Sequence, residues 1–386
     1  MNIGVPEIVA DGEQTTYRVS VESARKTDVL WYSVPESFGH LLTDSSDAAL
    51  VGLLAPAMAQ GESVTVEGEV SERLAYNVSQ RLQRLLQHVM PFLHCVDVRL
   101  GQTCCAWPQR APGVATGFSG GIDSYCVLAD HFYSDVPQGF RITHLLFNNV
   151  GALWGGVFNT KYNRLLALAE HLGLPLVGID SNLSSFYDST LHFQQTHTLR
   201  NASVALVLQG GIGRFMYASG YNYSQAWVGI SHDTAHVDTI LLPLLSTESL
   251  DAFSVGAEYT RVEKTLRVAE IEESHGTLDV CVGQNTSEYT NCSICGKCLR
   301  TLATLDIAGH LEEYSSQFDM DAYRRRRYKY FATLLSSRDP LLREIVHFAR
   351  AREYAFPFSV RLLCGTGIYS LVKLLKRTAL GLRHMG

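Results

Sequence analysis

The segment Ser119 to Ser124, with the sequence SGGIDS, combines residue types that can bind a phosphate. It lies between the apolar run Val114 to Phe118 and the run Tyr125 to His131, so we expect a strand, a glycine turn and a helix start. Glycines let backbone N–H groups approach an anion closely, and a helix N-terminus adds partial positive charge. The alternative is an ordinary turn, in which serine and glycine are also common.

Three cysteines at C-x2-C-x2-C spacing form a second motif with defined chemistry. Cys292, Cys295 and Cys298 make this motif, and Cys281 stands eleven positions before Cys292. Four thiolates complete a closed tetrahedral zinc shell, which predicts a structural Zn²⁺. An iron–sulfur cluster is the alternative. Disulfides are not expected, because the first residues of the chain do not resemble a signal peptide.

The order SGGxDS resembles the PP-loop of the ATP pyrophosphatases, which split ATP to AMP and pyrophosphate while adenylating a substrate oxygen. It lacks the Gly-Lys-Ser/Thr ending of the P-loop of kinases and GTPases. A PP-loop followed by a cysteine knuckle, here DVCVGQNTSEYTNCSICGKCLRTL, is similar to 7-cyano-7-deazaguanine synthase and its relatives, which use four cysteines for zinc. The resemblance covers roughly residues 112 to 305.

The resemblance implies ATP, Mg²⁺ and Zn²⁺ as cofactors and a defined set of site residues. The β,γ-phosphates of Mg²⁺·ATP would lie in the loop, and a carbonyl or carboxylate oxygen of the substrate would attack the α-phosphate. Arg200, in a Thr-Leu-Arg-Asn segment similar to one of the family, is a candidate clamp for phosphate or substrate; the alternative is a surface arginine at a helix start. The predicted cofactor-binding residues are Ser119, Gly120, Gly121, Ile122, Asp123, Ser124 and Asn148, and the predicted catalytic residues are Ser119, Asp123, Ser124, Arg200 and Cys126.

The nucleophile that attacks the adenylate is open. In the resembled family it is ammonia, and the acceptor is a purine- or deazapurine-like heterocycle. Sulfur is the alternative, because Cys126 lies in the first helical turn after the loop, where a thiol pKa is lowered. Cys126 could equally be a buried core thiol, and Cys104-Cys105 could relay sulfur. A third reading is a non-catalytic ATP-binding partner or sensor subunit.

Two further residues have both a chemical and an ordinary interpretation. His232 follows a short apolar run that we interpret as the fourth strand of the sheet, where ligands gather at strand ends, so it could be a general acid or base. An isolated histidine in a polar loop is more often solvated. Lys264 begins a predicted helix, Thr265 to Ile271, and could contact phosphate or lie on a solvated helix face.

The alternation of strands and helices predicts an α/β protein with a parallel sheet and flanking helices, an N-terminal α+β domain and a helical C-terminal extension. In the first hundred residues, alternating and helical patterns predict four strands and two helices. The expected domains are an accessory domain at 1–105, a PP-loop domain at 106–275, a cysteine knuckle at 276–310 and the helical extension at 311–386.

Composition limits the partners. The chain has 386 residues and a net charge of −6, which argues against broad nucleic-acid binding. The arginines at 324–327 would spread around a helix instead of forming one stripe. No apolar stretch is long enough to span a membrane. The chain has nine cysteines and no secretion signal, which favours a reducing compartment, so we expect a cytoplasmic enzyme. The expected partners are the heterocyclic acceptor, an ammonia source or sulfur-donor protein, and a second copy in a homodimer.

Overall fold

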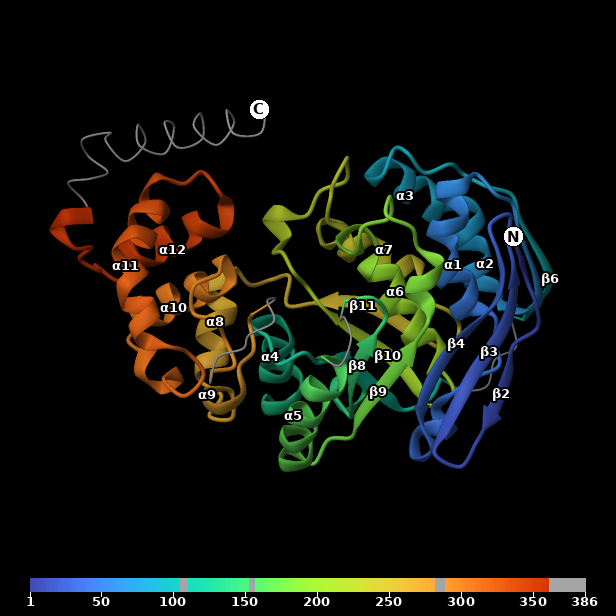
Figure 1. Cartoon of the computed structure of the whole chain (residues 1–386), viewed down its shortest axis with the longest axis horizontal. Helices are drawn as coiled ribbons and strands as arrows, with labels where there is room; N and C mark the ends of the chain where they lie inside the picture. The colour runs from blue at the N-terminus through green and yellow to red at the C-terminus, as the bar shows by residue number, and fades with distance from the viewer. Residues whose placement is uncertain (105–109, 153–156, 282–288, 361–386) are drawn as a thin grey trace. The chain divides into compact units, whose positions relative to one another are not determined.

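The computed structural model describes residues 1–104, 110–152, 157–281 and 289–360, and the chain divides into two compact units (Figure 1). The first unit contains Met1–Ser119 and Val127–Glu258. The second contains Gly120–Cys126 and the chain from Tyr259 onward. The domain boundaries expected from the sequence remain predictions.

One 11-stranded sheet forms the centre of the described part of the first unit. Its order is β11-β10-β7-β8-β9-β4-β3-β1-β5-β6, with β2 also paired to β3. Six strand pairings are parallel and four are antiparallel. The sheet is therefore mostly parallel, as predicted for an α/β protein. The strands are β1 (Asn2–Ile3), β2 (Glu7–Ala10), β3 (Gln14–Glu22), β4 (Thr27–Pro35), β5 (Val64–Ser71), β6 (Val98–Cys104), β7 (Gly113–Gly117), β8 (His144–Asn149), β9 (Leu176–Ser181), β10 (Ile212–Ala218) and β11 (Asp251–Val255).

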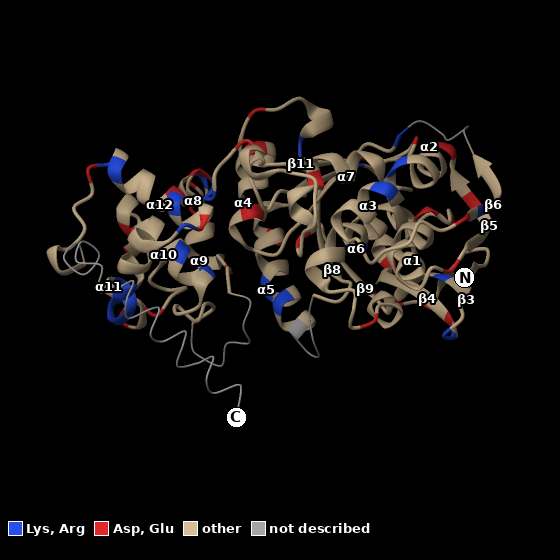
Figure 2. Ribbon diagram, turned by 90° about the horizontal axis from the view of Figure 1, so that it is seen from above, with Lys and Arg blue, Asp and Glu red and all other residues tan. Residues whose placement is uncertain are grey.

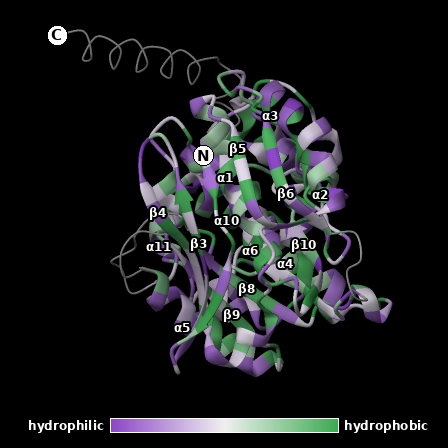
Figure 3. Ribbon diagram, turned by 90° about the vertical axis from the view of Figure 1, so that its right-hand side faces the viewer, coloured by the Kyte–Doolittle hydropathy of each residue, from purple (hydrophilic) through white to green (hydrophobic). Residues whose placement is uncertain are grey.

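The strand sequences explain their places in the sheet. Strand β3 alternates exposed and buried residues, as expected where one face meets solvent. Strands β8 and β9 carry continuous apolar runs, drawn mostly green in Figure 3, which suit parallel strands covered on both faces. Strand β4 pairs antiparallel with β9 through Tyr32 and Ser33. The N-terminal strands therefore continue the same sheet.

Helices cover this sheet. Helix α1 buries twelve residues, from Asp47 to Met58, and packs against α6 and β5. Its end is fixed by Gly61, whose φ of 63° is the left-handed conformation that glycine adopts without strain. The helices of the first unit are α1 (Asp47–Gln60), α2 (Glu72–Asn77), α3 (Gln83–Val89), α5 (Val157–Leu172), α6 (Phe193–Val207) and α7 (Asp238–Leu244).

The five parallel strands β7 to β11 have a diagnostic order. Numbered along the chain, they lie in the sheet as 3-2-1-4-5, so the first of them, β7, has β8 on one side and β10 on the other. This arrangement creates a topological switch point at the carboxyl end of β7, and open α/β sheets bind ligands at such points. The chain runs from β7 directly into Ser119–Ser124.

The second unit is helical in its described part. Helix α4 (Ile122–Leu128) begins in it, and α8 packs on α10 and α12, while α11 packs on α10 and α12. The predicted helical extension is confirmed over α11 and α12; the last 26 residues, 361–386, lie outside the described part. The other helices are α8 (Arg261–Ala269), α9 (Ser274–Thr277), α10 (Gly296–Ala308), α11 (Met320–Ser336) and α12 (Pro340–Ala351). Within the described ranges, no helix combines the length and apolarity that crossing a membrane requires.

Candidate functional site

The glycine turn has the predicted strand-turn-helix form. Strand β7 ends at Gly117 and α4 begins at Ile122. Gly120 has a φ of 75°, which a side chain would strain. The Ser124 hydroxyl is buried and donates to the Gly121 carbonyl at 3.0 Å, whereas Ser119 is exposed. Ser124 therefore stabilises the turn itself, and Ser119 is the serine open to a ligand.

Asp123 is held by two cations of α8. Its carboxylate lies 2.8 Å from Arg261 Nη1 and 3.1 Å from Lys264 Nζ. Burial by itself would raise the pKa of Asp123, but the charges of Arg261 and Lys264 outweigh it and the pKa is lowered. Lys264 is only 2% exposed, so its predicted alternative of a solvated helix face is wrong. Asp123 therefore stays ionised and ties the turn to α8.

Helix α10 adds two more basic residues to this region. Lys297 is exposed and Arg300 is half-buried, and neither forms an ion pair within the described residues. Burial, followed by the charge of Arg261, lowers the pKa of Arg300, and Asp123 acts on Arg300 with the opposite sign. The charges of Arg261 and Asp123 act on both cations of α10, and α10 packs on α8. We call Arg261, Lys264, Lys297 and Arg300 the cation cluster; Figure 2 shows the basic residues of α8 and α10 in blue.

The four cysteines come together as their spacing predicts. The sulfurs of Cys281, Cys292, Cys295 and Cys298 all lie within 4.8 Å of one another. Those of Cys292 and Cys298 are 3.8 Å apart, which is about the separation expected for two sulfurs at ~2.3 Å from one tetrahedral Zn²⁺. Sulfurs at this spacing fit one shared ion. The arrangement is compatible with a zinc site.

Two backbone N–H groups donate hydrogen bonds to cysteine sulfurs of the cluster. The N–H groups of Cys295 and Cys298 point at the sulfurs of Cys292 and Cys295, at 3.4 and 3.5 Å. Although burial opposes it, such bonds lower the pKa of Cys292 to about 7. Ser293 supports the turn with a φ of 61°, uncommon outside glycine, and its hydroxyl accepts from the Asp319 N–H. The thiolate form that metals require is therefore favoured at Cys292.

Asn291 joins the distant fourth cysteine to the motif. Its side-chain oxygen accepts from the N–H groups of Val280 and Cys281, and its amide donates to the Leu278 carbonyl at 2.8 Å. Asn291 is fully buried. Sequence reasoning missed this residue; its place directly before Cys292 was the available signal.

Arg200 is a core residue. It is 4% exposed, donates to the Val150 carbonyl at 3.0 Å and to Thr196 Oγ1 at 2.9 Å, and lies 3.6 Å over the Tyr187 ring. Within the described residues its guanidinium meets no carboxylate. The alternative of a surface arginine is therefore wrong, and the role of clamp remains a prediction.

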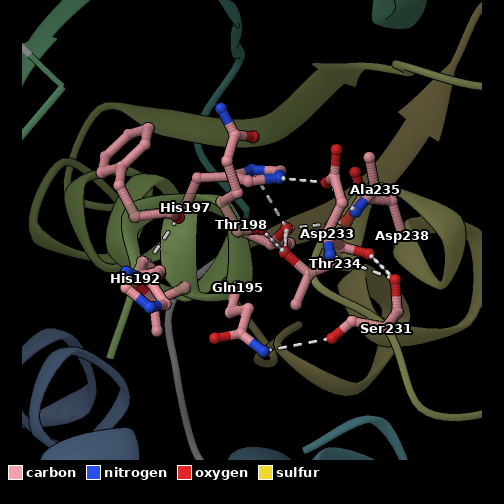
Figure 4. Close-up of polar contacts among 12 residues, drawn as sticks. His192, Gln195, His197, Thr198, Ser231, Asp233, Thr234, Ala235 and Asp238 are labelled. Carbon is pink, nitrogen blue, oxygen red and sulfur yellow. Dashed lines mark hydrogen bonds and ion pairs between the residues drawn. The ribbon is translucent and has the colours of Figure 1, made fainter. Parts of the chain in front are cut away.

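A polar network at the carboxyl ends of β8 and β10 surrounds His197, on α6 (Figure 4). Its Nδ1 lies 2.7 Å from the Tyr217 hydroxyl, and its Nε2 lies 3.2 Å from Asp233 Oδ1. Asn201 donates to the His197 carbonyl and accepts from Asn148 at 2.9 Å. The predicted residue Asn148 is therefore part of a shared edge network, which we call the His197 network.

Asp238 joins the His197 network through Thr198 and is almost fully buried. It accepts from the Thr198 hydroxyl at 2.7 Å, and Thr198 also contacts Thr234. Burial raises the pKa of Asp238 to about 6. Its second oxygen has no hydrogen-bond partner within the described residues. This carboxyl is therefore the group of the His197 network with the least stable ionised form.

The structure corrects the prediction for His232. The fourth parallel strand is β10, at Ile212–Ala218, and the apolar run before Gly229 forms no strand. His232 is exposed in a loop, whereas its neighbours Ser231 and Asp233 turn inward. The histidine that the fold brings to the sheet edge is His197.

The candidate sulfur carriers have different environments. Cys126 is 1% exposed, which favours the alternative of a core thiol over a persulfide carrier. Cys104 ends β6 and is half-buried, and Cys105 lies outside the described residues. The buried Cys126 therefore differs from a reactive thiol, which is partly exposed in electropositive surroundings.

Comparison of the chain with models of known protein families, with curated proteins and with solved structures finds no match.

Proposed function

We propose that the chain is an AMP-forming ATP pyrophosphatase of the PP-loop type, which adenylates a carbonyl or carboxylate oxygen of a purine- or deazapurine-like acceptor for attack by ammonia. One observation carries the proposal. A glycine turn with the SGGIDS sequence follows the central strand of a 3-2-1-4-5 parallel sheet, at its switch point, and its aspartate is fixed between Arg261 and Lys264.

The proposed chemistry needs positive charge and a fixed loop. The acceptor oxygen would attack the α-phosphorus, the bond to the β-phosphate would break, and pyrophosphate would leave with the electron pair. Negative charge on the departing phosphates is stabilised by preorganised cations and N–H donors. Arg261 and Lys264 supply such cations next to the loop, and Gly120 and Gly121 carry no side chains that would keep a phosphate from the backbone.

The second half-reaction would replace the adenylate by nitrogen. Ammonia would attack the activated carbon, AMP would leave with the former acceptor oxygen, and a proton would go to solvent. Mg²⁺ would neutralise part of the phosphate charge when bound with ATP. Asp123 is already paired with two cations, which supports loop orientation as its role.

Two alternatives make different products. Transfer of sulfur would give a thioamide or thionucleobase, but the burial of Cys126 weakens that route. An ATP sensor or partner subunit would bind nucleotide without forming AMP. The exposed Ser119 and the ionised Asp123 favour catalysis, because a turn that only connects two elements needs neither.

The test is product analysis with purified full-length protein. Mg²⁺·ATP is incubated with pooled purine and deazapurine acceptors and with ammonium or a persulfide donor, and products are resolved by mass spectrometry. We expect AMP and pyrophosphate in equal amounts, together with an acceptor that gains nitrogen. Ser119→Ala and Asp123→Ala should lower AMP formation, and Ser79→Ala on the helical segment between α2 and α3 is the matched control.

Each other outcome identifies an alternative. If the acceptor gains sulfur, the nucleophile is sulfur and not ammonia. ADP as product, or ATP binding with no AMP in any tube, rejects the proposal in favour of an ATPase or a sensor. Full AMP formation by both loop variants rejects the assignment of the loop.

A further inference from the structure

Two buried atoms of the His197 network have no hydrogen-bond partner among the described residues, and both atoms are acceptors. They are Asp238 Oδ2 and Asn148 Oδ1. The amide donors of the network are used, because Asn148 donates to Asn201 and Asn201 donates to the His197 carbonyl. Buried polar atoms are almost always paired, so an oxygen that is left over needs an explanation. A ligand that pairs such an oxygen must be a hydrogen-bond donor.

Asp238 offers the deeper of the two oxygens. This residue is 1% exposed, whereas Asn148 is half-buried. The other oxygen of Asp238 accepts from the Thr198 hydroxyl at 2.7 Å, and Thr198 lies 3.0 Å from the Thr234 hydroxyl. Both threonines are fully buried. Asp238 Oδ2 is therefore held in place and shielded from solvent, and leaving such an oxygen unpaired is costly.

A second carboxylate lies beside Asp238. The adjacent residues His197 and Thr198 of α6 contact Asp233 and Asp238 respectively, and Figure 4 shows these side chains gathered in one cluster. Burial opposes the ionisation of Asp233, but bonds from His197 Nε2 and the Ala235 N–H lower its pKa. Within the described residues, neither carboxylate forms an ion pair with a lysine or an arginine. The cluster therefore lacks positive charge as well as a donor.

A small cation that carries N–H groups supplies both. Ammonium has a positive charge and four N–H donors, and charge-assisted hydrogen bonds to carboxylates are among the strong ones. The shielding of Asp238 Oδ2 excludes a bulky amine. A divalent metal ion needs several protein ligands. In the part of the chain that the structure describes, the four cysteines are the only group of three or more His, Cys, Asp or Glu residues placed to hold a metal.

The network also lies where a ligand can take part in chemistry. Asn148 is near the carboxyl end of β8, and Tyr217, which lies 2.7 Å from His197 Nδ1, is near the carboxyl end of β10. These two strands flank β7 on either side. Open α/β sheets bind their ligands at this edge.

We propose that Asp238 Oδ2 is the main acceptor of an ammonium-binding site inside the His197 network. The role of this ammonium as the nitrogen source for the adenylate rests on the proposed function. The site itself is tested without ATP.

The first experiment measures Tm of the full-length protein against the concentration of ammonium chloride, with ionic strength held constant by sodium chloride. A ligand that binds only the native state raises Tm as its concentration rises, which gives an apparent Kd. Asp238→Asn should weaken this binding at least tenfold, the effect of losing one charge-assisted contact. Asp97→Asn, at an exposed carboxylate of the same unit, is the matched control and should behave like the unmodified protein. Equal values of Kd in Asp238→Asn and the unmodified protein overturn the site.

The second measurement needs no variant, so it does not depend on how Asp238→Asn folds. Hydrogen exchange of the unmodified protein is compared with and without ammonium. Binding should slow exchange in α6 and at the start of α7, because closing a local network raises the free energy of local opening. Exchange in α1 should not change. Unaltered exchange in α6 and α7, or equal slowing in all three helices, overturns the site.

Two other salts test the chemistry of the ligand. Tetramethylammonium chloride carries the same charge without an N–H donor, and it should leave Tm unchanged. Potassium chloride supplies a compact cation without a donor. If K⁺ raises Tm as strongly as ammonium does, the assignment of ammonium is overturned.

Kinetics separate this site from the proposed reaction. In Asp238→Asn, KM for ammonium should rise at least tenfold, whereas AMP formation at saturating ammonium should be less affected. If ammonium binds through Asp238 but no AMP forms under any condition, the site stands and the proposed adenylation fails. If AMP forms and KM for ammonium is the same in Asp238→Asn, the adenylation stands and this site as its nitrogen source fails.

Discussion

The cation cluster of the second unit and the His197 network of the first unit are both polar groups brought together from distant segments. In the cation cluster, Lys297 and Arg300 lack a carboxylate partner within the described residues, while Asp123 serves two cations. In the His197 network, His197 contacts both Tyr217 and Asp233, and Asn201 bonds Asn148. The cation cluster therefore has two cations without a carboxylate partner, whereas the His197 network is mostly paired and leaves only single oxygens, such as Asp238 Oδ2 and Asn148 Oδ1, without a partner among the described residues.

Substitution in the four-cysteine cluster gives the largest expected effect in the second unit. Cys292→Ser should lower bound zinc from about one ion per chain to near zero and destabilise the second unit by several kcal/mol, because metal binding contributes directly to folding. Metal analysis and thermal unfolding measure both. Cys95→Ser, at an exposed free cysteine, is the control. If Cys292→Ser retains its zinc in full, the four cysteines are not the zinc ligands.

Lys264 tests the charge next to the turn. Lys264→Met should lower AMP formation by roughly 10²- to 10³-fold, the usual effect of removing a group that stabilises developing charge. It also leaves Asp123 with Arg261 alone, so the pKa of Asp123 should rise toward its ordinary value. Rates of AMP release are compared with Lys329→Met on α11, which should match the unmodified protein. A Lys264→Met rate within threefold of normal contradicts the proposal.

The raised pKa of Asp238 predicts that the stability of the His197 network depends on pH. Burial raises its pKa to about 6, so the folded state binds this proton more tightly than the unfolded state does. Stability from this group is present below pH ~4 and is lost as pH rises to about 6, by roughly 2 to 3 kcal/mol. Asp238→Asn should flatten that part of the profile of Tm against pH. An identical profile in the variant shows that Asp238 titrates normally.

Substitution of His197 gives the smallest expected change in stability. His197→Gln should cost about 1 to 2 kcal/mol of stability, since the contacts to Tyr217 and Asp233 are weakened. AMP formation per folded molecule should stay within about threefold. His232→Gln, at the exposed neighbour, should change stability by less than about 0.5 kcal/mol. Loss of AMP formation with normal thermal stability would instead make His197 a catalytic residue.

Much of the local structure could be predicted because its signals are local. The turn between β7 and α4 follows from an apolar run, two glycines and a helix start, and the structure places it there. The helix predicted from Thr265 begins earlier, at Arg261, because Thr260 and Glu263 form a capping box. This capping box is visible in the sequence, but the prediction of the helix did not use it.

The sequence by itself determined the alternation of strands and helices, the strand, glycine turn and helix start around SGGIDS, and the spacing that lets the four cysteines come together. Periodicity, turn chemistry and ligand spacing act over a few residues, so they are readable without the fold. Only the tertiary structure decided that Asp123 meets Arg261 and Lys264, that Arg200 is buried over Tyr187, and that His197 replaces His232 at the sheet edge. These contacts depend on how helices pack against distant segments, and no local pattern encodes that geometry.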